Sequence, residues 1–94
     1  MTRVATASLG PVRYSDLRAH VARGAVIVVA PSLDLVEVAE VLARDDKARV
    51  ATWIAEKWLE KPTSEVVRRW EQAEGDVATS VVVQPFVLVH DRTA

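Results

Sequence analysis

The chain has 94 residues, 50% of them hydrophobic, and its 12 basic and 13 acidic side chains leave a formal net charge of −1. This length fits one domain and this apolar content can build a core, so a second domain and a disordered chain are both excluded. The balanced charge excludes a polycation, and the lack of cysteine excludes disulfides, thiolate catalysis and cysteine-based metal sites.

The first patterned segments predict a short helix and a buried strand. Ser15 has the chemistry of an N-cap, and Gly24 stands where the helix should end. Between them, Leu17 and Val21 lie four positions apart and share an inner face. The run 25–30 is rich in β-branched residues and apolar on both faces, so it predicts a strand in the interior of a sheet.

Two helices separated by a short break follow this strand. Asp34 is the expected N-cap of the first, and we expect Asp45 or Asp46 to cap the second by accepting backbone N–H bonds. At helical spacing, the apolar stripes contain Leu35, Val38, Ala39 and Leu42 in the first helix and Val50, Trp53, Ile54 and Trp58 in the second. Trp58 lies at the end of its helix, so it is the tryptophan we expect at the surface.

The last third of the chain predicts one more helix and an extended segment. Pro62 ends the preceding helix, because the residue before a proline is disfavoured in the helical conformation. Thr63 then opens a fourth helix that stops near Gly75. The run 81–89 predicts a strand interrupted at Pro85, or two short strands, because proline cannot donate to a β-ladder.

Together these elements predict one α+β domain over residues 1–94, with about four helices packed on a short sheet in the order helix, strand, helix, helix, helix, strand. Residues 1–10 and 91–94 lack a clear pattern and are expected to fray. The outline also resembles a winged helix. The expected core contains Leu17, Val21, Ile27, Val29, Leu35, Val38, Leu42, Val50, Trp53, Ile54, Trp70, Val82, Phe86 and Leu88.

The side chains that carry chemistry form no recognisable catalytic, metal or cofactor motif. His20 and His90 are far apart in the sequence, and no serine lies in a nucleophile elbow. The three glycines are too scattered to cradle a phosphate. The acidic residues Asp34, Glu37 and Glu40 fit a solvated helix flank better than a magnesium site. We therefore expect no cofactor and no metal.

The helix–turn–helix outline makes nucleic-acid binding one functional hypothesis. Four basic side chains decorate the second of these helices and its end, namely Lys47, Arg49, Lys57 and Lys61. Against this hypothesis, Asp45 and Asp46 place negative charge at the start of the helix that would read DNA, and the chain is net acidic. A weaker hypothesis is an enzyme with a carboxylate site near these two residues and Asp34.

The hypothesis we favour is a non-enzymatic protein-interaction module that binds a second copy of itself or a small protein partner. The run 81–89 is apolar on both faces, and Pro85 indicates an incompletely paired edge. A two-fold homodimer is the commonest way to cover such a surface. The expected interface contains Val81, Val83, Phe86, Leu88 and Trp58.

Several segments resemble a small bacterial family catalogued as domain of unknown function 2288. They are residues 11–17 and 26–39, Asp45-Asp46, Trp53-Ile54, Lys61-Pro62-Thr63 and residues 84–89. The resemblance implies a small cytoplasmic domain and supplies no catalytic residues. The chain departs from the family pattern at Ala30, where members prefer an acid, and near Lys57, where members prefer a helix-ending glycine.

No segment is expected to bring the chain to a membrane. Residues 1–10 lack the apolar run of a secretory leader, and the longest apolar stretches, 25–31 and 81–89, are far shorter than the roughly 20 residues that span a bilayer. Because the chain also has no cysteine, we expect it in the cytoplasm.

Overall fold

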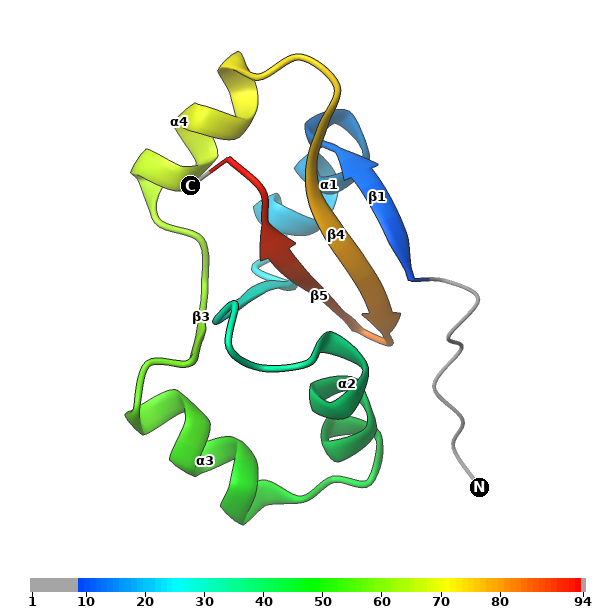
Figure 1. Ribbon diagram of the computed structural model, residues 1–94, viewed down its shortest axis with the longest axis vertical. Coiled ribbons are helices and arrows are strands. Elements are labelled where there is room, and N and C mark those ends of the chain that lie inside the picture. Colours follow the sequence, from blue (N-terminus) through cyan, green and yellow to red (C-terminus); the bar gives the residue numbers. More distant parts are fainter. Residues whose placement is uncertain (1–8, 94) are drawn as a thin grey trace.

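The computed structural model describes residues 9–93, which form four helices and five strands (Figure 1). In chain order they are β1 (Gly10–Arg13), α1 (Tyr14–Ala22), β2 (Val26–Val29), α2 (Leu35–Ala43), α3 (Lys47–Ala55), β3 (Leu59–Glu60), α4 (Ser64–Gln72), β4 (Asp76–Val83) and β5 (Phe86–Asp91). The expected α+β class is confirmed, whereas the expected order lacks β1 and β3. Of the two alternatives for the run 81–89, the structure has two strands, β4 and β5, on either side of Pro85. None of the helices in this part of the chain is long and apolar enough to cross a membrane.

The five strands form one mixed sheet in the order β1-β4-β5-β2-β3. β4 and β5 are an antiparallel hairpin with a cis Gln84-Pro85 bond at its turn, and β2 runs parallel to β5. β2 pairs with β5 on one side and with β3 on the other, which confirms that it is an interior strand. The hairpin lies inside the sheet, so within residues 9–93 it is not the free wing of a winged helix.

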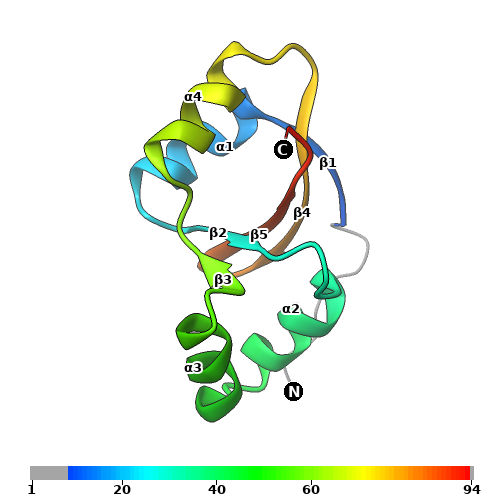
Figure 2. The same cartoon turned by 60° about the vertical axis from the view of Figure 1, so that its left-hand side comes forward.

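Helices cover both faces of this sheet, with α1 and α4 on one side and α2 and α3 on the other (Figure 2). Alternation along β2 assigns its side chains to the two faces, because successive side chains of a strand point in opposite directions. Val26 and Val28 pack in the cluster with Leu17 of α1 and Trp70 of α4. Val29 packs in the other cluster, with side chains of α2 and α3. The apolar character of both strand faces is therefore explained by two cores.

The expected core is wrong at three positions. Ile54, Val82 and Phe86 are 57%, 38% and 37% exposed, respectively. In the hairpin, Val81 and Leu88 are the buried pair that faces α2, so the alternation of the strand turns Val82 toward the other face, near the turn. The other expected core side chains are buried, or partly buried and packed against one of the two clusters.

Three helices end on a residue in the left-handed conformation, namely Gly24, Asp45 and Lys57. At each end two backbone N–H groups bond back to carbonyls of the last helical turn, as when Trp58 N donates to Trp53 O at 2.8 Å. Gly24 was expected to end its helix, and it does. Because α3 stops at Ala55 by this motif, Trp58 follows the helix and does not belong to its apolar stripe.

Side-chain caps fix the helix starts. Asp34 and Thr63 accept bonds from Val36 N at 2.9 Å and Val66 N at 3.2 Å, as expected. Ser15 is not a cap, because α1 begins one residue before it and Asp16 instead accepts a bond from Arg13 N at 3.2 Å.

Five of the residues that we expected to fray fall within residues 9–93, and three of them, Leu9, Arg92 and Thr93, belong to no helix or strand. Gly10 belongs to β1 and Asp91 to β5. Residues 1–8 and 94 lie outside the described residues. The expectation that they fray, and the expectation that the first residues are not a secretory leader, therefore stay predictions.

Candidate functional site

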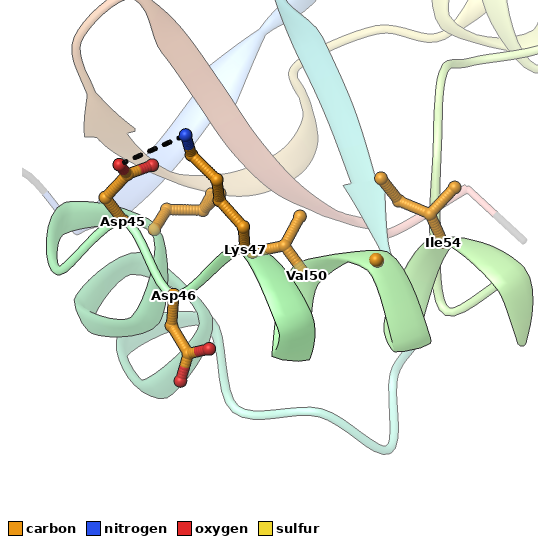
Figure 3. Close-up of a pocket in the computed structure, with 7 residues that line it drawn as sticks. Asp45, Asp46, Lys47, Val50 and Ile54 are labelled. Atoms are coloured by element: carbon orange, nitrogen blue, oxygen red, sulfur yellow. Dashed lines mark ion pairs between the residues drawn. The ribbon is translucent and has the colours of Figure 1, made fainter.

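An apolar groove, which we call the α3 groove, runs along helix α3. Its wide part has a volume of about 450 Å³ and lies between α2, α3 and the β2–β3 edge of the sheet. Its narrow part, about 220 Å³, lies at the start of α3 beside the end of α2 (Figure 3). The two parts share Leu42, Val50 and Ile54, so they are continuous. The wide part is completed by Ile27, Lys57, Leu59, Glu60 and Lys61, and the narrow part by Asp45, Asp46, Lys47 and Ala51.

The apolar wall of this groove is a stripe on α3. Val50, Ala51 and Ile54 lie at helical spacing, and Figure 3 shows Val50 and Ile54 rising from the same side of the helix. Trp53, between them in sequence, points into the core and is 6% exposed. The helix therefore has two apolar faces, one buried against the sheet cluster and one open to solvent.

The groove begins at Asp45 and Asp46, which confirm the expected helix break and cap. Asp46 accepts a bond from Arg49 N at 3.2 Å and is the N-cap of α3. The carboxylate of Asp45 lies 3.9 Å from the Lys47 ammonium (Figure 3). Both side chains of that pair are about four-fifths exposed, so the ion pair contributes little to stability.

Replacing Asp46 by alanine is expected to lower the free energy of unfolding by about 0.5–2 kcal/mol, because the first turn of α3 loses its acceptor. Urea unfolding followed by tryptophan fluorescence measures the change. The matched control is Asp45→Asn, which removes the neighbouring charge but keeps a residue type that tolerates the left-handed conformation. A loss from Asp45→Asn as large as that from Asp46→Ala would contradict the assigned cap.

Lys57, at the other end of α3, holds a backbone φ of 62°, which glycine adopts without a steric cost. Lys57→Gly is therefore expected to raise the free energy of unfolding of the monomer by about 0.5–1 kcal/mol. Thermal unfolding by circular dichroism tests this, with Lys61→Gly, outside any helix, as the control. A lower melting temperature for Lys57→Gly would show that the lysine side chain contributes more to stability than the strain costs.

The structure does not gather the four expected nucleic-acid contacts into one free basic face. Lys47 is beside Asp45, and Arg49 pairs with Glu37 at 3.2 Å and stacks on the Trp53 ring. The remaining two, Lys57 and Lys61, line the opposite end of the α3 groove.

Two of the expected dimer contacts are inside the protomer. Val81 and Leu88 are fully buried, because α2 packs over this face of the hairpin. Val83 is partly buried, and only Phe86 and Trp58 are exposed, at 37% and 42%. The exposure of Trp58 and the burial of the other two tryptophans, Trp53 and Trp70, are as expected.

The structure does not bring together the three carboxylates of the weaker, enzyme hypothesis. Asp34 precedes α2, whereas Asp45 and Asp46 follow it, so the whole length of this nine-residue helix, about 14 Å, lies between them. Glu37 is paired with Arg49. Within residues 9–93 no group of three or more His, Cys, Asp or Glu side chains is arranged to hold a metal ion.

Each histidine has a local hydrogen-bond partner. His90 Nε2 donates to the Leu33 carbonyl at 2.8 Å, and His20 Nδ1 accepts from Arg23. Both histidines therefore have ordinary hydrogen-bond roles, and within the described residues neither belongs to a group arranged to hold a metal ion.

A polar cluster that no sequence pattern predicted lies between α4 and the end of β5. Asp91 Oδ1 accepts from Trp70 Nε1 at 3.0 Å and from the backbone N and hydroxyl of Thr93. Asp91 Oδ2 accepts from Arg69 at 3.1 Å. Partial burial raises the pKa of Asp91, but the hydrogen bonds from Thr93, Trp70 and Arg69 outweigh it and hold the pKa below its usual value. Because both carboxylate oxygens of Asp91 accept hydrogen bonds, we interpret this cluster as a structural contact that joins β5 to α4.

Comparison with known proteins gives a family and one solved structure. A family model described as protein of unknown function (DUF2288) matches residues 3–91, in agreement with the resemblance noted from the sequence. No curated protein matches the chain. The fold is similar to the NMR solution structure of PA1075 from Pseudomonas aeruginosa, with 31% sequence identity and a TM-score of 0.77. That match covers 98% of this chain and 91% of the other.

Proposed function

The chain belongs to the DUF2288 family, and from that premise we propose that it is a non-enzymatic protein-interaction module whose contact surface is the α3 groove. The partner in this proposal is a protein surface with an apolar centre. We place the module in the cytoplasm, in keeping with the absence of cysteine.

The observation that carries the proposal is the open apolar face of α3. Among the described residues 9–93, Ile54 is the most exposed large hydrophobic side chain, at 57%, and it lies on the rim of a groove walled by Leu42, Val50 and Leu59. Scattered apolar side chains are common on protein surfaces, but an apolar side chain beside an apolar groove forms a continuous patch. Patches of this kind mark sites where another molecule excludes water.

The charges around the groove favour a protein over a nucleic acid. A phosphate backbone is bound by several unpaired basic groups on one surface. Here Asp45, Asp46 and Glu60 line the same groove as Lys47, Lys57 and Lys61, so acids and bases are equal in number.

Site-specific photo-crosslinking in the cells that make the protein tests this proposal. A photoreactive phenylalanine analogue replaces Ile54 in the groove or Arg18 on α1, which covers the opposite face of the sheet. We expect protein adducts from position 54 and none from position 18. The adducts should disappear when Ala51→Glu places a charge in the groove. Equal adducts at both positions, or adducts that survive Ala51→Glu, would overturn the groove as the contact surface, and no adduct at position 54 would overturn the function.

A further inference from the structure

We infer that the protein bound at the α3 groove is a second copy of this chain, packed across a two-fold axis with its α3 antiparallel to the first. This inference rests on the proposed function and names the partner for the same surface. In a two-fold homodimer each copy contributes the same patch, so the patch must be complementary to itself.

The charges along the groove have this self-complementarity. The start of α3 lines the groove with two carboxylates and one ammonium, those of Asp45, Asp46 and Lys47. The other end lines it with two ammoniums and one carboxylate, those of Lys57, Lys61 and Glu60. The formal charge is therefore −1 at one end and +1 at the other, and antiparallel packing brings each end against its opposite.

The spacing along α3 makes the pairing specific. Ala51 is the middle residue of the helix, and a two-fold axis at Ala51 sets residues equally far before and after it against each other. Asp45 lies six residues before Ala51 and Lys57 six residues after it, so each carboxylate faces the ammonium of the other copy. Both residues are exposed and flank the helix in left-handed conformations. A partner carboxylate gives the lysine side chain a role at a position that suits glycine.

The apolar side chains fit the same arrangement. Ile54 lies in the second half of α3, so antiparallel packing sets it against the first turn of the other helix. There the narrow part of the groove is lined by Leu42 and Val50. The small side chain of Ala51 at the axis lets the two helices approach closely. Both copies thus bury Ile54 without moving a core residue.

Sedimentation equilibrium of the full chain tests the inference. We expect the wild-type protein to have twice its chain mass of 10.3 kDa at micromolar concentrations. Ile54→Asp should weaken dimerisation by at least about tenfold, with an unchanged circular dichroism spectrum and melting temperature of the monomer. The matched control is Phe86→Asp at an exposed aromatic side chain, the first residue of β5, and this substitution should leave the dimer intact.

Reversing the charges of Asp45 and Lys57 tests the proposed pairing between the two copies more specifically. Asp45→Lys alone and Lys57→Asp alone should each weaken the dimer several-fold, because each sets like charges against each other. The two substitutions in one chain should restore it, because each pair re-forms with the signs exchanged. An additive loss in the double variant would overturn the pairing.

Two other outcomes would overturn the inference. The first of them would leave the proposed function as an interaction module untouched. A mass that stays at 10.3 kDa over a hundredfold range of concentration excludes the dimer. If position 54 then still crosslinks to a different protein, the module function stands and only its partner is wrong. A dimer that Phe86→Asp dissociates and Ile54→Asp does not would place the interface at the hairpin.

Discussion

Replacing Trp70 by alanine is expected to lower the free energy of unfolding by about 3–5 kcal/mol, the largest effect of any substitution proposed for this chain. Trp70 is fully buried between α4 and the sheet, in the cluster that contains Leu17, Val26 and Val89. The alanine variant leaves a cavity in one of the two cores and removes the Nε1 donor that Asp91 accepts. Domains of this size are stable by only about 5–15 kcal/mol, so the variant should unfold at markedly lower urea concentration.

Trp58→Ala is the control for this prediction. Trp58 is 42% exposed and lies outside both apolar clusters, so its loss should change stability by less than about 1 kcal/mol. Trp70→Phe separates the two contributions of Trp70, because phenylalanine keeps the apolar ring and lacks the donor. An alanine variant of Trp70 as stable as that of Trp58 would show that α4 is not held to the sheet as the structure has it.

Much of the fold was predictable because it depends on local signals. The run at β2 is apolar on both faces, and a strand with two apolar faces needs cover on both sides, which α1 with α4 and α2 with α3 provide. The caps Asp34, Asp46 and Thr63 were recognisable because capping is decided by one side chain and the next turn of backbone.

Other parts of the fold depend on contacts that a sequence pattern does not contain. β1 and β3 have four and two residues, too few for an alternation to show, and they are strands only because β4 and β2 supply their hydrogen bonds. The register of the hairpin depends on where its turn lies. The expected alternation put Val82 inside, whereas the observed register puts Val81 inside.

The sequence identified the charged residues of the candidate site but not its apolar surface. The sequence predicted Asp45 and Asp46 as a helix cap or part of a carboxylate site, and Lys57 and Lys61 as part of a DNA-binding face. Ile54 was assigned to the core, because the spacing of Val50, Trp53 and Ile54 fits one broad stripe. Only the packing shows that Trp53 takes the buried face and leaves Ile54 on the open one. A helix with more apolar surface than the sheet can cover is the signal that sequence analysis could have used.

Replacing Asp91 by asparagine is expected to lower the free energy of unfolding at neutral pH by about 1.5–3 kcal/mol, the second largest effect. The carboxylate is 10% exposed and accepts charge-assisted or buried bonds from Arg69, Trp70 and Thr93. These bonds join the end of β5 to α4, and Figure 1 shows the red segment that follows the β5 arrow running toward that helix. An asparagine amide turns one acceptor into a donor, so at least one of these donors loses its partner.

The contribution of Asp91 to the free energy of unfolding should decrease as the pH falls. Because the pKa of folded Asp91 lies below its usual value near 3.8, the unfolded chain binds the proton more readily than the folded one. The contribution of Asp91 is therefore complete above that value and disappears as the pH falls through the lower, folded pKa. Urea unfolding at a series of pH values should show wild type and Asp91→Asn far apart at pH 7 and converging below about pH 4. Asp76→Asn, an exposed acid at the start of β4, is the control and should follow the wild-type curve. A difference between wild type and Asp91→Asn that stays constant down to the acid limit would show that the asparagine acts through its shape and that the ionised carboxylate does not hold β5 to α4.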